Sequence, residues 1–209
     1  MEITSEKDPG SLAFPLPIYQ SVRIGKAVSR EGEIFLIFAG LSEYLVSALK
    51  KRSLDESDEE IREKTSDRWR FGLGSYEEWY AKNRVPFALV HEKSNALAAL
   101  VWLGPKQMGR KSLSRLSLEE RKQNESLLSA ENWHTLSYRS YPPFRGKGLM
   151  KGFSRFAMDY YAAHYPGAKF WTGLDADNLP SMRLAEGLGF KISEEASDEA
   201  AHWLVMVKE

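Results

Sequence analysis

The sequence predicts an α/β protein with a central sheet flanked by helices, and three stretches support this prediction. Residues 132–164 read as a strand, a glycine-containing turn and an amphipathic helix. Residues 168–190 read as a second strand followed by a short helix, and residues 86–103 as a β-hairpin. With 209 residues, the chain is long enough to form one well-packed domain.

The composition excludes several classes of protein. The 29 basic residues balance the 29 acidic ones, so bulk charge favours neither nucleic acid nor an anionic membrane. The absence of cysteine excludes disulfides and thiolate nucleophiles, and the four histidines lack metal-motif spacing. Residues 1–17 do not resemble a signal peptide, and the longest apolar run, 34–41, is far shorter than the roughly 20 residues that span a bilayer. We therefore expect a cytoplasmic protein without metal, nucleic-acid or membrane binding.

From the N-terminus, we expect residues 1–17 to form an extension and residues 18–209 a single domain. Residues 22–27 read as a first strand. Residues 32–51 read as an amphipathic helix because their apolar side chains fall on one side: Ile34, Ile37, Phe38, Leu41, Leu45 and Ala48. The acidic stretch 55–63 reads as the solvated start of another helix.

A hairpin follows, with strands at residues 86–91 and 96–103 and a polar turn at 92–95. Residues 105–131 form a long insertion before the strand 132–140. The first part of the insertion is basic, with Lys106, Arg110, Lys111 and Arg115, and Ser117 to Glu120 form a capping-box pattern that predicts a short helix. Loops of this length are usually functional or disordered, so a cofactor lid or partner surface stands beside the simpler interpretation, a solvated insertion.

The turn Arg145-Gly146-Lys147-Gly148 has the physical properties of an anion site. A helix begins directly after it, and the N-terminus of a helix presents unpaired N–H groups and the positive end of the macrodipole. Glycines allow a phosphate to approach the backbone closely, and Arg145 and Lys147 add positive charge. The turn is neither a Walker loop nor a GxGxxG motif, and by itself such a turn is common.

The spacing of apolar residues and the capping residues predict the remaining elements. The helix after the turn shows a 3.6-residue apolar repeat at Leu149, Phe153, Phe156, Ala157 and Tyr160, and residues 165–167 end it. A strand spans residues 168–174. Asn178 starts the next helix, Pro180 lies in its first turn and Gly189 ends it. Residues 202–208 form the last strand.

Two segments together resemble the signatures of GCN5-related N-acetyltransferases, the GNAT superfamily. The first, RGKGLM, is similar to the family pattern Q/R-x-x-G-x-G/A at Arg145 and Gly148, with Met150 where Gly or Ala is usual. The second, NLPSMRLAEGLGF, follows the family pattern N-x-x-[AS]-x-x-L-Y-x-x-x-G-F at Asn178, Ser181, Leu184, Gly189 and Phe190. Tyr138 to Pro142 stand where the family's L-A-V-x-P ends the central strand. The resemblance covers residues 133–207 well and residues 20–104 in outline.

The resemblance implies the GNAT fold, a central mixed, mostly antiparallel sheet flanked by helices, with the 105–131 insertion between the third and fourth strands. It also implies binding of acetyl-CoA (coenzyme A), with the pyrophosphate in the glycine turn. The residues that it assigns to the cofactor are Tyr138, Ser140, Arg145, Gly146, Lys147, Gly148, Leu149, Met150, Asn178 and Ser181.

Acetyl transfer to an amine requires a base, an oxyanion donor and, optionally, an acid. A family glutamate on the central strand falls near His134 here; a structural histidine held by a backbone bond is the alternative, and Glu131 is the nearest acidic substitute. The family's oxyanion donor is a backbone N–H, which falls within residues 138–140. Ala185 stands where the family usually has the tyrosine that acts as general acid. Tyr138, Tyr141 or water would therefore protonate the leaving thiolate here.

The acceptor is expected to be the amine of a small molecule or a peptide. Residues 69–87 contain many rings, Trp69, Phe71, Tyr76, Trp79, Tyr80 and Phe87, and Gly72 and Gly74 between them. In the family this region lines the acceptor pocket, whereas the simpler interpretation for each ring is core packing. A non-catalytic acyl-CoA-binding module is the alternative to an enzyme, and a homodimer remains open.

Overall fold

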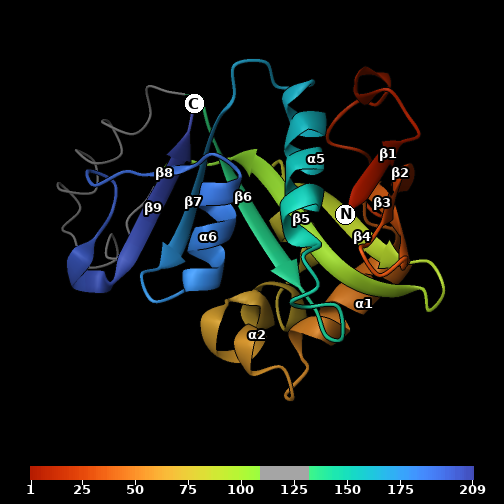
Figure 1. Ribbon diagram of the computed structural model, residues 1–209, viewed down its shortest axis with the longest axis horizontal. Helices are drawn as coiled ribbons and strands as arrows, with labels where there is room; N and C mark the ends of the chain where they lie inside the picture. The colour runs from red at the N-terminus through yellow and green to blue at the C-terminus, as the bar shows by residue number, and fades with distance from the viewer. Residues whose placement is uncertain (109–131) are drawn as a thin grey trace. The chain divides into compact units, whose positions relative to one another are not determined.

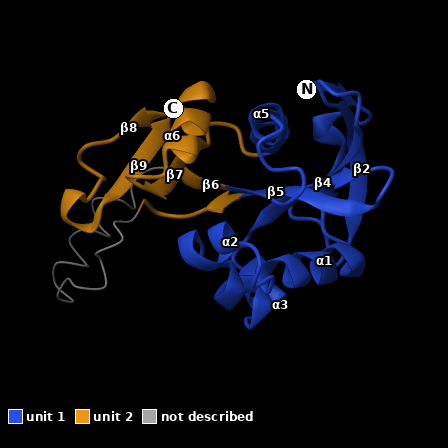
Figure 2. Cartoon of the chain, turned by 60° about the horizontal axis from the view of Figure 1, so that its bottom comes forward, with its two compact units in different colours: residues 1–102, 138–164 blue, residues 103–137, 165–209 orange. Residues whose placement is uncertain are grey.

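The computed structural model describes residues 1–108 and 132–209, and the chain forms two compact units (Figure 2). Residues 1–102 and 138–164 form the first unit, and residues 103–137 and 165–209 the second. Two strands, β5 (Ala96–Pro105) and β6 (Trp133–Ser140), contribute residues to both units.

The first unit is built on antiparallel strands. Its strands β1 (Glu2–Ser5), β2 (Ser21–Val28), β3 (Ile34–Gly40) and β4 (Val85–His91) pair successively in antiparallel fashion, and β5 follows β4 in the strand order. Six of the seven residues of β4 are buried. A strand that is covered on both faces is apolar throughout, which explains the run V-P-F-A-L-V. The predicted hairpin strands at residues 86–91 and 96–103 are confirmed, and β4 and β5 each extend slightly further.

The prediction of one helix over residues 32–51 is wrong. Ile34–Gly40 is strand β3, paired with β2 and β4, and the helix α1 begins only at Glu43 and ends at Ser53. A short apolar run fits both periodicities, and the β-branched and aromatic residues of I-F-L-I-F favour the strand once partners exist on both sides. Gly40 ends the strand at φ +73°, where a Cβ would lie 2.3 Å from the carbonyl oxygen of Gln20. Ser42 then caps α1.

A strand lies within the predicted N-terminal extension, residues 1–17, and it changes the numbering of the strands around the insertion. Glu2–Ser5 pairs with β2 as strand β1, which the sequence did not indicate. The strands on either side of the insertion are therefore the fifth and sixth of the chain, not the third and fourth. The predicted helix at residues 117–120, most of the basic residues of the insertion, and Glu131 lie outside the described residues. The single domain at 18–209 stays a prediction.

Helices lie on both sides of the sheet of the first unit. Figure 2 shows α1, α2 (Glu59–Lys64) and α3 (Tyr76–Tyr80) on one side of these strands and α5 (Met150–Ala162) on the other. A π-helical turn, η2 (Arg68–Gly72), precedes α3, and a short 3-10 turn, η1 (Pro9–Ser11), lies near the N-terminus. The predicted helix after the glycine turn is confirmed as α5, with Phe153, Ala157 and Tyr160 buried as expected.

The aromatic segment contributes mainly to the core. Four of its rings are buried: Phe71, Tyr76, Trp79 and Phe87. Phe71, Tyr76 and Trp79 belong to the core cluster under α1 that also contains Leu49, Trp102 and Tyr141. Trp69 is the exception, since 71% of its surface is exposed. The core interpretation is thus confirmed for these four rings and wrong for Trp69.

The second unit contains a mixed sheet. Its strands follow the order β6, β7 (Lys169–Asp175), β9 (Trp203–Lys208) and β8 (Lys191–Ile192). The pair of β6 and β7 is parallel, and the other two pairs are antiparallel. Helix α6 (Leu179–Gly187) follows β7 (Figure 1), and the 3-10 turn η4 (Glu199–Ala201) precedes β9. Asn178 caps α6 through a 3.2 Å bond from the Ser181 N–H, which confirms the predicted helix start.

Candidate functional site

The turn between β6 and α5 presents an open backbone. Gly146 and Gly148 have φ angles of +81° and +69°, and no described residue other than their chain neighbours has a heavy atom within 4 Å of a Cβ built at either position. Helix α5 begins directly after the turn, and no side chain of the described residues caps its N-terminus. Its first-turn N–H groups have no partner within the helix. The turn is therefore a cradle of N–H groups and positive macrodipole that glycine leaves accessible to an anion.

The guanidinium of Arg145 is held by the protein itself. Its Nη1 and Nη2 donate to the two carboxylate oxygens of Asp58 at 3.0 and 2.8 Å, and Nε and Nη2 donate to the Ser140 carbonyl at 3.2 and 3.0 Å. Glu60 lies 3.2 Å from Nε. This bidentate pair fixes the turn to the start of α2, because Asp58 also caps that helix.

Asp58 is a residue that sequence reasoning missed. It lies in the acidic stretch interpreted as solvated, yet only 5% of its surface is exposed, so that interpretation is wrong at this position. Its partner Arg145 is 87 residues away in the sequence. Only a capping position ahead of a helical stretch could have singled out Asp58 beforehand.

Lys147 is paired as well. Its Nζ lies 2.9 Å from Glu33 and 3.6 Å from Glu31, and the hydrogen bond to Glu33 raises the pKa of the lysine. The carboxylates of Asp58, Glu31 and Glu33 thus offset both cations of the turn. An anion in this turn would therefore depend on the backbone N–H groups more than on surplus side-chain charge.

The tyrosines of this region differ in access. Tyr138, on β6, is half-buried. Tyr141 is fully buried, and its hydroxyl has no hydrogen-bond partner among the described residues. Its ring lies 5.6 Å from the Arg52 guanidinium, and burial raises the pKa of its hydroxyl above the ordinary value of 10.0. A proton donor must reach the departing sulfur, and Tyr138 is the more exposed of the two tyrosines, so it is the better candidate.

The other predicted site residues belong to the second unit. His134 is buried, and its Nε2 lies 2.8 Å from Asn132 Oδ1, with the Tyr165 ring 5.5 Å from the imidazole. Burial lowers the pKa of His134 below 6.5. Asn178 uses its side-chain oxygen to cap α6, and Ala185 is fully buried.

The structure thus distributes the predicted residues over both units. The first unit holds Tyr138, Ser140, Tyr141 and the turn from Arg145 to Met150, and the second holds His134, Asn178 and Ser181. Within residues 1–108 and 132–209, no three His, Asp or Glu side chains are close enough to hold a metal ion. No helix in these ranges is long and apolar enough to cross a membrane.

Comparison with known proteins identifies the class of this chain. A family model described as an acetyltransferase (GNAT) domain matches residues 49–191. The match covers the turn, α5 and α6, and it makes the protein an acyltransferase. The chain belongs to the GNAT acetyltransferase family.

Solved structures of this fold are similar over most of the chain. RimJ from Mycobacterium smegmatis, in complex with CoA-disulfide, is 13% identical with a TM-score of 0.59, covering 91% of this chain and 87% of its own. A GNAT acetyltransferase from Listeria monocytogenes is 15% identical with a TM-score of 0.58, covering 88% and 99%. The ribosomal-protein-S5-alanine acetyltransferase of Vibrio fischeri is 12% identical with a TM-score of 0.58, covering 87% and 96%. No curated protein matches the sequence significantly.

These likenesses show the fold, which confirms the expected mixed, mostly antiparallel sheet with helices.

Proposed function

We propose that this acetyltransferase uses acetyl-CoA and transfers the acetyl group directly to a primary amine of a small molecule or a peptide. The open glycine turn at the uncapped N-terminus of α5 is the observation that supports this proposal most strongly. The similar RimJ structure holds CoA-disulfide, in keeping with coenzyme A as the carrier of the acetyl group. Direct transfer is favoured because no cysteine is present to carry the acetyl group as a thioester.

We propose an amine as the general class of acceptor, because the similar proteins are named for different amine acceptors. One is a ribosomal-protein-S5-alanine acetyltransferase, and another is a chimera of a spermidine N-acetyltransferase, with 16% identity and a TM-score of 0.52. One acceptor is a protein and the other a small polyamine. Amine chemistry is what they share.

The residues of the turn fit a pyrophosphate. Backbone N–H groups from Gly146 to Met150 would hold it, and both glycines leave room for the phosphate oxygens. Arg145 would act by holding the turn in place, since Asp58 already occupies its guanidinium. Lys147, paired with Glu33, would contribute charge at the edge.

The chemistry requires the amine to lose a proton and attack the thioester carbonyl. A C–N bond forms, the oxyanion of the tetrahedral intermediate collapses, and the C–S bond breaks to release the CoA thiolate. We propose His134 as the base that accepts the amine proton. Its lowered pKa keeps the imidazole neutral, and therefore able to accept, near pH 7. A backbone N–H within residues 138–140 would stabilise the oxyanion, and Tyr138 would protonate the thiolate.

The proposal is tested by measuring acetyl-CoA binding and then turnover. At about 100 times its dissociation constant, acetyl-CoA should stabilise the fold by about 2.7 kcal/mol. For a chain of this size that raises the melting midpoint by roughly 5–11 °C, at about 2–4 °C per kcal/mol. Free CoA should then appear only when an amine panel is added. Binding without amine-dependent CoA release would instead indicate the non-catalytic acyl-CoA-binding module.

A first prediction concerns Gly148. In Gly148→Ala the new Cβ would occupy the open space over the turn, so acetyl-CoA affinity should fall by about tenfold or more by calorimetry. The matched control is Gly167→Ala. Gly167 also has a positive φ, +78°, and the described part of the chain leaves open space around a Cβ there, but Gly167 lies after α5. Equal affinity losses in the two variants would mean that backbone strain, and not phosphate contact, explains the result.

A second prediction concerns the pair that anchors the turn. Asp58→Ala leaves Arg145 without its buried partner, and we expect the free energy of unfolding to fall by about 2–3 kcal/mol. This loss is smaller than that for a fully buried ion pair because the Arg145 side chain is 28% exposed. Acetyl-CoA affinity should fall with it. Glu60→Ala removes the exposed partner of the same arginine and should cost under about 1 kcal/mol. An unchanged affinity in Asp58→Ala would show that the turn holds its shape without this pair.

A further inference from the structure

A second cluster of charges in the first unit lies outside the proposed cofactor turn. Asp67 has no exposed surface and is shared by two arginines. Arg139 donates from Nε and Nη2 to its two oxygens at 2.6 and 3.0 Å, and Arg70 donates from Nη1 to Oδ1 at 2.8 Å. Both guanidinium groups lie against the Trp102 ring, at 5.1 Å for Arg139 and 5.6 Å for Arg70.

The charges of this cluster do not balance. Among the described residues, one carboxylate bonds two guanidinium groups, which leaves a net charge of +1 on this cluster; Arg139 is only 20% exposed and Arg70 32%. Arg84, also positively charged, lies close enough to interact with Arg70 electrostatically. Burial lowers the pKa of Arg70 despite its bond to Asp67, which is the behaviour of an incompletely compensated cation.

The surplus lies on Arg70. Nε and both terminal nitrogens of Arg139 are bonded, to Asp67 and to the Tyr138 carbonyl. Within residues 1–108 and 132–209, the hydrogen bond of Arg70 is the one from Nη1 to Asp67, and its guanidinium also lies over the faces of Phe71 and Trp102. Its Nε and Nη2 are therefore available as a planar pair of donors, the arrangement that binds a carboxylate bidentately.

The cluster lies beside the strand proposed for acyl transfer. Arg139 stands between Tyr138 and Ser140, and its contact with Asp67 directs it toward the η2 side of β6. The buried hydroxyl of Tyr141 interacts electrostatically with Asp67 and Arg139. It has no hydrogen-bond partner among the described residues. The polar groups here are thus incompletely satisfied.

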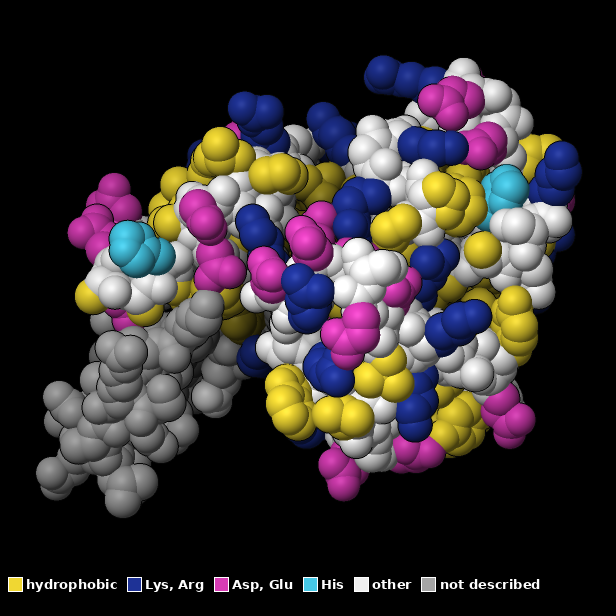
Figure 3. Space-filling model, turned by 90° about the horizontal axis from the view of Figure 1, so that it is seen from below, with side chains coloured by type: hydrophobic (Ala, Val, Ile, Leu, Met, Phe, Trp, Pro, Cys, Tyr) yellow, Lys and Arg dark blue, Asp and Glu magenta, His cyan; other side chains and the backbone are white. Residues whose placement is uncertain are grey.

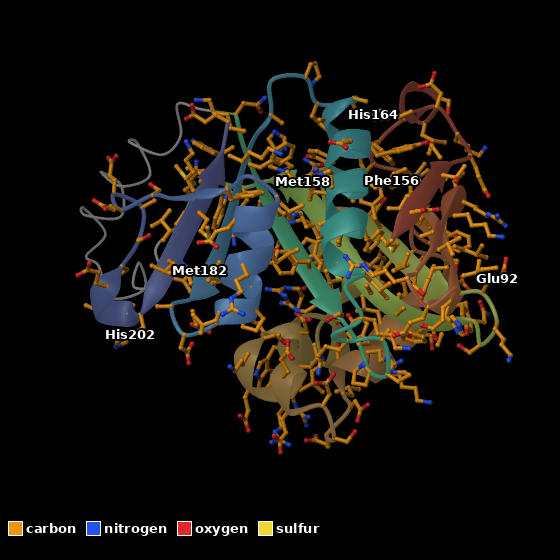
Figure 4. The ribbon with its side chains drawn as sticks, viewed as in Figure 1. Glu92, Phe156, Met158, His164, Met182 and His202 are labelled. Atoms are coloured by element: carbon orange, nitrogen blue, oxygen red, sulfur yellow. The ribbon has the colours of Figure 1, made fainter. Side chains whose placement is uncertain are left out.

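The positive charge is a local feature. On the face drawn in Figure 3, basic and acidic side chains are interspersed, and the whole chain has no net charge. An anion drawn to Arg70 would be bound by this cluster and not by a general field.

We infer that Arg70, held by Asp67 beside Arg139 and Trp102, binds a carboxylate group carried by the amine acceptor. This inference rests on the proposed N-acetyltransferase function and narrows its acceptor to amines that also carry a carboxylate. Arg70 is the residue that determines this specificity, and Asp67 and Arg139 position it.

The test compares ω-amino acids with their amides, in which the amine is nearly the same and only the carboxylate is neutralised. Suitable pairs are γ-aminobutyrate with γ-aminobutyramide and ε-aminohexanoate with ε-aminohexanamide. The two pairs differ in chain length, so that two spans from amine to carboxylate are compared. We expect kcat/KM for at least one acid to exceed that of its amide by about tenfold or more, the usual effect of a charge-assisted hydrogen bond.

The variant is Arg70→Met, which should reduce the acid-to-amide ratio to about one. It is expected to fold, because Asp67 keeps its bidentate pair with Arg139. Arg70→Lys keeps the charge without the planar donors and should lose most of the preference, which covers the case in which the methionine variant is unstable. The matched control is Arg68→Gln, on the same turn but paired with Glu56 at the surface, which should leave the ratio unchanged.

Two results would overturn the inference: equal acetylation of acids and amides by the wild type, or an acid-to-amide ratio that survives in both Arg70 variants. In the second case, weaker acetyl-CoA binding by the variants would assign Arg70 to a phosphate of the cofactor. If no amine is acetylated at all, the proposed function fails instead. Calorimetry of the same pairs then decides the inference: tighter binding of an acid than its amide in the wild type, lost in Arg70→Met, supports it, and equal binding rejects it.

Discussion

Replacing Asp67 with alanine should destabilise the protein by about 3–5 kcal/mol, one of the two largest effects that we expect. The carboxylate is fully buried and is the bonded counter-charge of both Arg139 and Arg70. Its removal leaves two guanidinium groups together on the Trp102 ring, and breaking a buried ion pair strands an uncompensated charge. Chemical denaturation measures the loss, and the melting midpoint should fall by roughly 6–20 °C.

The comparison for Asp67 is a surface pair from the same segment. Glu56 bonds Arg68, and these side chains are 65% and 38% exposed. Glu56→Ala should cost under about 1 kcal/mol, because water replaces an exposed partner. Adding Arg139→Met to Asp67→Ala should recover part of the stability, since it removes one stranded cation. If Asp67→Ala cost no more than Glu56→Ala, Asp67 would not be the stabilising counter-charge of Arg139 and Arg70.

Replacing His134 with alanine should lower kcat by about 10²–10⁴-fold, the usual contribution of a general base, with little change in acetyl-CoA affinity. His134→Gln is a second variant that retains a polar group beside Asn132, which lies 2.8 Å from the imidazole. Both variants should lose rate, because neither can accept the amine proton. The control is His91→Ala, whose imidazole bonds Ser94 in the turn after β4. An unaltered rate in both His134 variants would leave His134 as a structural histidine held by Asn132.

The pH dependence gives an independent reading of His134. Burial lowers its pKa below 6.5, so the folded state binds the proton less readily than the unfolded state does. Its contribution to stability is therefore present above the unfolded pKa, near 6.5, and is lost as the pH falls through the lower, folded pKa. The rate should decline in the same acidic range, because the protonated imidazole cannot act as a base. In His134→Gln the stability profile should be flatter below pH 6.5.

Local sequence patterns predicted the helix that follows the glycine turn and the helix that follows β7. The spacing of Leu149, Phe153 and Ala157 predicted α5, and Asn178 with Pro180 predicted the start of α6. The two motifs on these helices predicted the family, which the match over residues 49–191 confirms. These signals were readable because helix periods, caps and glycine turns depend on residues within a few positions of one another.

The sequence alone determined the family, the glycine turn and the helices α5 and α6. The tertiary structure decided that residues 34–40 form a strand, since β2 and β4 supply its partners. It also decided that Asp58 and Asp67 are buried counter-charges, because Arg145 and Arg139 lie 87 and 72 residues away. The local sequence around a carboxylate is the same whether its partner in the folded protein is water or an arginine. Only folding brings those distant charges together, and burial then turns an ordinary aspartate into the anchor of a site.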